Sequence, residues 1–347
     1  MLRQLIEFFK YDLYIKEWDM DAISLNGDMT MLKTNTFQLI HMLSDIVNDL
    51  NVTVLARLHH IIESGKDVDE YAQKDTNFQK WIEGSKLPTM KNIEDFAKKF
   101  YVPLGYMFLD TPPQEECPIP FYRSTTNEHN NINVYDTVLT IQERQEWLSG
   151  YLRSEGFDKN HFVGLIKDYS NVDEACRTIY EILNLPINWA FDFTKVEDAL
   201  KHITNILEDK GVMVCYNGVV GYNNNRPIPV KECRGFALID DYAPFIFINN
   251  KDAKSAQMFT IIHELVHILI GHSAGFGDND GQIQESVLER FCDKVSATFL
   301  VPEILLKEEW SKVGENYAVL AKRFKVSRFV IARRAKEIGY ISEQHYY

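Results

Sequence analysis

The chain has 347 residues, a length that predicts about two domains and at most three small ones. Hydrophobic residues make up 45% and charged residues 25%, which excludes a disordered or fibrous protein and is typical of a soluble globular one. The formal net charge is −13, from 37 basic and 50 acidic residues. This charge argues against a protein that coats nucleic acid over its whole surface, but it permits a local basic patch.

The cysteines and the apolar runs indicate a cytoplasmic protein. The N-terminal segment is interrupted by Glu7 and Lys10 and has no signal-peptide pattern, and no apolar run reaches the length of about 18 residues that suggests a membrane span. The five cysteines are scattered without a C-x-x-C pair, which favours reduced thiols in a cytosol. They are Cys117, Cys176, Cys215, Cys233 and Cys292.

The N-terminal third is helical in pattern. Residues 1–50 contain one amphipathic stripe, from Phe37 to Leu50, and give no functional signal. Residues 51–111 read as five short helices, with Gly84 and Pro88 between the third and the fourth. Four prolines between positions 112 and 120 predict an extended linker and a domain boundary. We therefore divide the chain into 1–50, 51–111, 112–310 and 311–347.

The rest of the chain predicts a mostly helical α+β fold with a small β-sheet. Helical periodicity is followed by three short β-rich runs, and these are followed by two further helices bounded by glycine and proline. The helical region is 135–210, the three runs are 211–220, 234–241 and 243–250, and the two helices are 255–272 and 285–303.

The first of those two helices contains the motif H-E-x-x-H, formed by His263, Glu264 and His267. Residues four apart lie on one face of a helix, so both imidazoles can bind one metal ion. Glu264 lies beside them, where it can hold and deprotonate a metal-bound water. Apolar residues surround the motif and predict a buried, rigid helix.

A catalytic zinc site needs a third protein ligand and an open fourth position. The next helix offers Glu289, 22 residues beyond His267, and Asp293 follows on the same helix face. Glu285, one turn earlier, is the reserve third ligand. His272 lies nine residues after His263, which places it on the opposite side of the helix and argues against a ligand role.

These motifs resemble a known family. The segments TIIHELVHILIGH and LERFCDKVSATFLVPE, and the strands in RGFALIDDYAPFIFINN, are similar to the ImmA/IrrE metallopeptidases of bacteria, phages and mobile elements. The resemblance covers residues 55–340, and H-E-x-x-H followed by E-x-x-x-D is the gluzincin pattern. Two positions depart from it, since many relatives have Ala where Cys292 stands and Asn where Asp293 stands.

The resemblance implies a zincin-like peptidase fold and a role for each motif residue. His263, His267 and Glu289 would hold one Zn²⁺ ion, and Glu264 would act as the general base. Asp293 would hold a ligand histidine in position, as carboxylates behind metal-bound histidines do.

The resemblance also implies a substrate class. Members of this family cut a DNA-binding repressor, so we expect a zinc-dependent endopeptidase that makes limited cuts in a regulatory protein. That protein would be an Xre-type repressor of a phage, a mobile element or a stress response. The strands Arg234–Asp240 and Pro244–Asn249 would offer an edge to an extended substrate.

Two other functions stay open. One is a DNA- or protein-binding transcriptional regulator or antitoxin-like protein with an idle or structural zinc site. Glu264 argues against it, because a structural zinc site needs no base and usually closes with four ligands. The other is a hydrolase acting on a non-protein amide, which zinc chemistry alone does not separate from a peptidase.

The segment FQKWIEGSKLPTMKNIEDFAKKFYVPLGYMFLDTPPQEECPIPFYRS resembles the repressor-type, Xre-like helix-turn-helix that often precedes this peptidase. The motif is degenerate, because nine positions rather than about thirteen separate Ala72 from Trp81. Residues 51–110 also carry eight basic and nine acidic residues, a poor balance for binding DNA. We favour a docking or sensor role for this module.

The C-terminal segment has a helix-turn-helix core from Ala321 to Ser327. Residues 312–347 contain eight basic and three acidic residues, a local charge of +5. One interpretation is nucleic-acid binding through Lys325, Arg328, Arg333 and Arg334. We favour the other, a small helical cap on the peptidase with a solvated basic rim, because relatives commonly carry this segment in the peptidase unit. Nucleic acid is thus not expected as the main ligand, and no membrane is expected as a partner. The oligomeric state is not fixed by the sequence.

Overall fold

The computed structural model describes residues 88–100, 132–271 and 281–342. It also describes single positions between 77 and 105, namely Asn77, Lys80, Trp81, Ser85, Lys86, Leu104 and Gly105. The chain forms two compact units, and residues 132–342 lie in the larger one. The predictions for residues 1–50, and most of the predicted helix-turn-helix module in 51–111, lie outside the described residues.

In the smaller unit, helix α5 (Met90–Phe100) follows Pro88 as the sequence predicts. Its start is capped by Thr89 and Asn92, since the Asn92 Oδ1 accepts the Thr89 amide at 3.0 Å and the Thr89 Oγ1 accepts the Asn92 amide at 3.3 Å. Ile93, Phe96 and Ala97 are buried and share one face. The helix is therefore amphipathic, as its hydrophobic period requires.

A three-stranded mixed sheet lies inside the larger unit. Its strand order is β1 (Met213–Asn217), β5 (Phe245–Asn249) and β4 (Gly235–Leu238). The central strand β5 pairs in parallel with β1 and antiparallel with β4. Successive side chains of a strand point to opposite faces. Phe245 and Phe247 accordingly join one hydrophobic core, and Ile246 and Ile248 join another.

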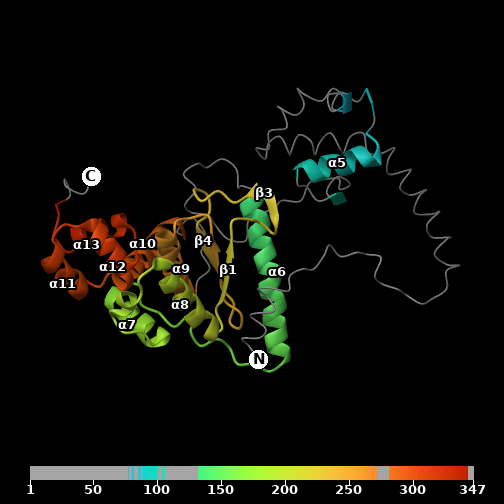
Figure 1. The fold of residues 1–347 in the computed structure, drawn as a ribbon. Helices are drawn as coiled ribbons and strands as arrows, with labels where there is room; N and C mark the ends of the chain where they lie inside the picture. Colours follow the sequence, from blue (N-terminus) through green and yellow to red (C-terminus); the bar gives the residue numbers. More distant parts are fainter. Residues whose placement is uncertain are drawn as a thin grey trace. The chain divides into compact units, whose positions relative to one another are not determined.

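Helices cover both faces of this sheet (Figure 1). Helix α6 (Ile132–Ser154) covers the face that carries Phe245 and Phe247, and its own Val138 and Leu148 are buried there. Helix α9 (Lys254–Ile270) covers the other face, beside α8 (Val196–Asp209). At Gly235 the strand β4 runs so close to α9 that a Cβ would lie 2.5 Å from Thr260 Cγ2.

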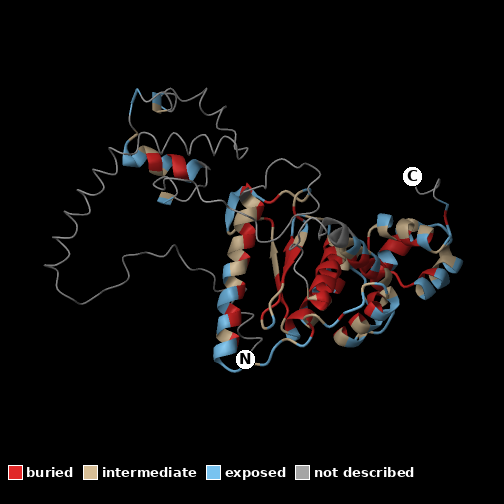
Figure 2. Ribbon diagram, turned by 180° about the vertical axis from the view of Figure 1, so that it is seen from behind, coloured by how far each residue is buried: buried red, intermediate tan, exposed pale blue. Residues whose placement is uncertain are grey.

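Helix α9 is buried along nearly its whole length, because the sheet and several helices enclose it (Figure 2). Helix α10 (Gly281–Leu300) packs against α9 on one side and α7 (Val172–Leu183) on another. A helix that is apolar all round is stable only when it is enclosed in this way. The buried helix gives the H-E-x-x-H motif a rigid support.

The C-terminal end of α9 is fixed by a close backbone contact. Gly271 has φ +76, and a Cβ there would lie 2.7 Å from the Gly164 Cα. The amides of Gly164 and Ile166 donate to the last carbonyls of the helix, those of Ile268 at 3.1 Å and Leu269 at 2.7 Å. These bonds satisfy acceptors that a helix end otherwise leaves without partners.

The C-terminal helices share the core that encloses α9. Leu320, Phe324 and Ile331 belong to the same buried cluster as Leu265 and Ile268. They lie on α12 (Tyr317–Phe324) and α13 (Arg328–Glu337), which follow α11 (Glu303–Val313). A short turn containing Lys325 at φ +60 joins α12 to α13, and the Ser327 side chain caps α13.

The structure confirms the predicted fold class, a mostly helical α+β domain with a small mixed sheet. Each of the three predicted β-rich runs contains one strand of that sheet. A two-stranded sheet of β2 (Val219–Val220) and β3 (Asn223–Pro227) and a short 3₁₀ helix, η3 (Trp189–Asp192), were not predicted. Within the described ranges, no helix is both long and apolar enough to cross a bilayer.

Candidate metal centre

Helix α9 places two imidazoles together inside the protein. His263 and His267 are 2% and 4% exposed, and their Nε2 atoms lie 3.2 Å apart. They are one helical turn apart, so the spacing of the motif brings them to the same face. The helix itself is held by the sheet and by α10, which leaves these rings little freedom to move.

Helix α10 brings a carboxylate to the same point. The two oxygens of Glu289 lie 3.3 Å from the His263 Nε2 and 3.1 Å from the His267 Nε2. One ligand atom from each of the three residues falls within 4.8 Å of the others, which makes them a possible metal-binding group. The sequence could not fix this contact, because it depends on how α10 crosses α9.

The separations fit a single small ion. Ligand atoms bound tetrahedrally at about 2.0–2.1 Å lie roughly 3.3 Å from one another, and the observed separations are 3.1–3.3 Å. Two imidazoles and one carboxylate form the donor set of catalytic rather than structural zinc sites. The residues present therefore fit a metal ion that keeps a position open for another molecule.

The electrostatics of Glu289 favour the ionised form that binds metals. Burial acts to raise the pKa of its carboxyl, but the hydrogen bonds and charges of His263 and His267 outweigh burial. The pKa of Glu289 is therefore held well below its usual value. A carboxylate that is already deprotonated gives up no proton when a cation binds.

The outer nitrogens of the two imidazoles also have partners. Asp293 Oδ1 lies 3.2 Å from the His263 Nδ1. The Cys292 sulfur lies 3.8 Å from the His267 Nδ1. An ionised Asp293 can only accept, so its contact favours a proton on the His263 Nδ1 and a lone pair on the Nε2 that faces the metal position. The contact between Cys292 and His267 is compatible with either tautomer of that ring.

Glu264, the predicted general base, is 7% exposed and follows His263 on the buried helix. The alternative third ligand cannot be compared with Glu289, because the side chain of Glu285 lies outside the described part of the chain. His272 lies outside it as well. The structure thus brings together three predicted ligands and Asp293, with Glu264 adjacent in the sequence.

Two neighbours of the site were not predicted for this role. Cys292 comes three residues after Glu289, so helical spacing alone was a signal for it. Arg333 lies on α13, and its Nη1 is 3.5 Å from the Asp293 Oδ2. No local sequence pattern connects Arg333 with Asp293, which lies forty positions earlier. In the sequence, Arg333 was instead one of four candidates for nucleic-acid binding.

The four residues proposed for nucleic-acid binding differ in their surroundings. Lys325 is 5% exposed, and its ammonium donates to the carbonyls of Lys322 and Arg323. Arg334 is 7% exposed and donates to the Val301 carbonyl. Nucleic-acid binding by this segment stays a prediction, and these two members are engaged in internal contacts.

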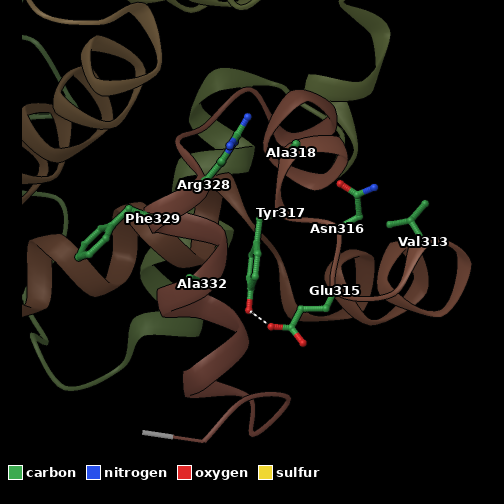
Figure 3. Close-up of a pocket in the computed structure, with 8 residues that line it drawn as sticks. All are labelled: Val313, Glu315, Asn316, Tyr317, Ala318, Arg328, Phe329 and Ala332. Carbon is green, nitrogen blue, oxygen red and sulfur yellow. Dashed lines mark hydrogen bonds between the residues drawn. The ribbon is translucent and has the colours of Figure 1, made fainter. Parts of the chain in front are cut away.

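Arg328, another of the four, lines an open pocket on the C-terminal helices (Figure 3). Tyr317, Glu315 and Phe329 also line this pocket. The Tyr317 hydroxyl donates a hydrogen bond of 2.6 Å to a carboxylate oxygen of Glu315. The remaining lining residues are Val313, Asn316, Ala318 and Ala332. None of the lining residues belongs to the metal centre, so the pocket is a separate feature.

An H-E-x-x-H helix on a small sheet, with a carboxylate from the next helix, is the arrangement of a zincin-like metallopeptidase domain. Comparison with known proteins agrees with this class. Residues 208–336 match the M78 peptidase family, described as the IrrE N-terminal-like domain. The resemblance to ImmA/IrrE metallopeptidases is thus confirmed for this stretch, which contains every residue of the metal centre.

A curated relative gives the same result. The chain is 34% identical over 95 residues to the radiation response metalloprotease IrrE of Deinococcus radiodurans. The match covers 24% of this chain and 27% of the relative. The chain therefore matches about a quarter of the curated relative's length, and the predicted N-terminal helix-turn-helix module lies outside the family match and stays a prediction.

Proposed function

We propose that this chain is a zinc-dependent endopeptidase that makes limited cuts in a regulatory protein. The observation that carries the proposal is the convergence of His263, His267 and Glu289 next to a buried Glu264. The match to a peptidase family over the same residues supports it. Three protein ligands, rather than four, come together among the residues that the structure describes, which favours a catalytic over a structural site.

Zinc is the metal that this donor set fits best, because imidazole nitrogen and carboxylate oxygen both bind it at short range. A bound zinc ion supplies Lewis acidity that polarises the carbonyl of the scissile peptide bond. His263, His267 and Glu289 would hold this single ion, and the contacts at their outer atoms would keep the rings oriented.

Glu264 performs the proton transfers in this proposal. Its carboxylate accepts a proton from the attacking water and then donates it to the nitrogen of the leaving amine. The helix around it is buried and apolar, so bulk water does not compete for the carboxylate. Replacing Glu264 by glutamine removes the basic oxygen and leaves the three metal ligands in place.

Strand β4 is suited to hold an extended substrate. In the three-stranded sheet β5 is paired on both sides, whereas β4 lies at one edge and packs on α9. Of the two strands predicted to offer an edge, β4 therefore is the one that lies at an edge of the sheet formed by the described residues. A peptide that added to β4 would form backbone hydrogen bonds beside the helix that carries the histidines.

The substrate we propose is a DNA-binding repressor of the Xre type. Such a repressor would control the genes of a phage, of a mobile element or of a stress response. The motif resemblance supports this class, and the curated relative is named as a radiation response protease. The scattered cysteines, four of which are free in the structure, are consistent with action in the cytoplasm. The burial of Lys325 and Arg334 weighs against nucleic acid as the main ligand.

The test compares new protein N-termini in cells that express the wild type or Glu264→Gln. The proposal expects a small set of new N-termini with the wild type alone, and expects at least one of them to lie within a DNA-binding regulator. The purified regulator should then be cut by the wild type and spared by the variant. Equal cutting by both proteins would contradict the proposed role of Glu264, and the absence of any new terminus would contradict the proteolytic function.

A further inference from the structure

Arg333 connects the C-terminal helix α13 to the metal centre. Its guanidinium Nη1 lies 3.5 Å from the Asp293 Oδ2, and the other oxygen of Asp293 lies 3.2 Å from the His263 Nδ1. A charged group on α13 is thus two contacts away from a predicted metal ligand. Arg333 is 36% exposed and Asp293 is 29% exposed at their side chains, so the pair is partly shielded from water.

Asp293 has a like charge close to it on its own helix. Asp293 follows Glu289 by four residues, and like charges at this spacing on a helix repel one another. This repulsion favours an outward turn of the Asp293 side chain. The Arg333 guanidinium opposes that movement, because it attracts the oxygen of Asp293 that does not face His263.

Arg333 is itself held by a network on α13. Its Nε lies 3.5 Å from a Glu337 oxygen, and Arg334 Nη1 lies 2.6 Å from the other Glu337 oxygen. Arg334 in turn donates to the Val301 carbonyl at 3.2 Å, just beyond the end of α10. The guanidinium of Arg333 therefore stands between two carboxylates, and one of these is tied to the segment that follows α10.

We propose that Arg333 is a positioning residue of the metal centre, which acts through Asp293 to keep His263 oriented for metal binding. This inference rests on the proposed function, since it requires that the site binds zinc. It assigns Arg333 to the peptidase rather than to nucleic-acid recognition. Partners behind a metal-bound histidine fix its tautomer and orientation, so loosening them weakens metal binding.

The expected effect is a loss of zinc affinity. Removing the partner of a metal-bound histidine typically costs about 10- to 100-fold in affinity, and Asp293→Ala should fall in this range. Arg333→Gln acts one contact further out, so we expect a loss of roughly three- to tenfold. Arg333→Lys retains the positive charge but not the planar fork, and its affinity should lie between those of the wild type and Arg333→Gln.

The experiment titrates zinc into the metal-free full-length protein in competition with a chromophoric chelator. The variants are Arg333→Gln, Arg333→Lys, Asp293→Ala and the double variant Asp293→Ala with Arg333→Gln. Arg328→Ala is the matched control, because it removes another arginine of α13 that lines the separate pocket. Thermal unfolding of each metal-free variant reports any general loss of stability.

We expect Arg333→Gln to weaken zinc binding when it is the only substitution. In a protein that already carries Asp293→Ala, it should have no further effect on zinc affinity. Arg328→Ala should bind zinc like the wild type. Wild-type affinity in Arg333→Gln would overturn the inference, as would an equal loss in both backgrounds. If the wild type itself binds no zinc, the proposed function fails first and this inference fails with it.

Discussion

Among the residues of α10, Glu289 has the most direct role in metal binding. Its carboxylate contacts both imidazoles, and their influence keeps its pKa well below the usual value despite burial. Glu289→Ala should therefore lower zinc affinity by more than about 100-fold, a larger loss than that of an outer partner. Zinc titration of the metal-free protein measures this. The control is Glu308→Ala, which removes a surface carboxylate paired with Lys312 on α11.

Cys176 should be chemically inert in the folded protein. Burial raises the pKa of its thiol to about 12, and its sulfur lies 3.5 Å from the Val295 carbonyl. Because the folded pKa lies above the unfolded one, this thiol favours folding below the unfolded pKa, and that contribution is lost as the pH rises through about 12. At pH values near 8 the group stays a thiol and reacts slowly.

Alkylation followed by mass spectrometry checks this expectation. Cys176 should be modified in denaturant and spared in the native protein, whereas the less buried Cys215 should react sooner. Rapid native labelling of Cys176 would show that the interface between α7 and α10 opens readily, contrary to the close contact seen here.

The sequence predicts those site residues that are close together along the chain. His263, Glu264 and His267 are specified by helical spacing, and the E-x-x-x-D pattern pointed to Glu289 and Asp293. Arg333 was only a candidate for nucleic-acid binding in the less favoured interpretation of its segment, because its contact with Asp293 depends on the placement of α13 against α10. A local sequence pattern contains no information about such a crossing.

The C-terminal end of helix α9 depends on a contact between two glycines. Gly271→Ala would place a Cβ 2.7 Å from the Gly164 Cα in a left-handed backbone conformation. The conformation alone costs roughly 1–2 kcal/mol, and the contact forces the backbone to shift as well. We expect the free energy of unfolding to fall by more than about 2 kcal/mol in denaturant titrations.

Gly156→Ala is the matched control for this prediction. Gly156 has a similar φ of +74, but nothing lies within 4 Å of its added Cβ. Only the conformational cost should appear there, roughly 1–2 kcal/mol. Equal effects of the two substitutions would mean that the contact between Gly271 and Gly164 contributes nothing.

Elements with a strong hydrophobic pattern were predicted, and those held by polar contacts were not. The apolar runs of β1, β4 and β5 are β-rich and identified the sheet. Strand β3 has the sequence NNNRP, which disfavours a strand. It is held by Arg226, which donates from Nε to Asn133 at 3.0 Å and pairs with Asp136 on α6. Such long-range polar contacts have no signature in a short window of sequence.

The C-terminal helices belong to the same hydrophobic core as helix α9. Leu320 and Ile331 are fully buried and Phe324 is 1% exposed. Each such side chain contributes roughly 1.5–3 kcal/mol, so the three together contribute roughly 5–9 kcal/mol. This is comparable with the typical stability of a whole domain, about 5–15 kcal/mol.

A truncation after Gly314 should therefore not fold cooperatively. Circular dichroism and denaturant titration of the truncated chain check this, with a truncation after Ser342 as the control. If residues 311–347 were an independent nucleic-acid-binding segment, the shorter chain would instead unfold like the full-length protein.

The measurement that bears most directly on the metal centre is the amount of zinc bound per chain. Purified protein, reconstituted with zinc and freed of excess ion, should contain one zinc per chain by elemental analysis, because three ligands converge on one point. The same preparation of His263→Ala should contain almost none. A wild-type protein that retains no zinc, or an undiminished zinc content in His263→Ala, would contradict the proposed metal centre.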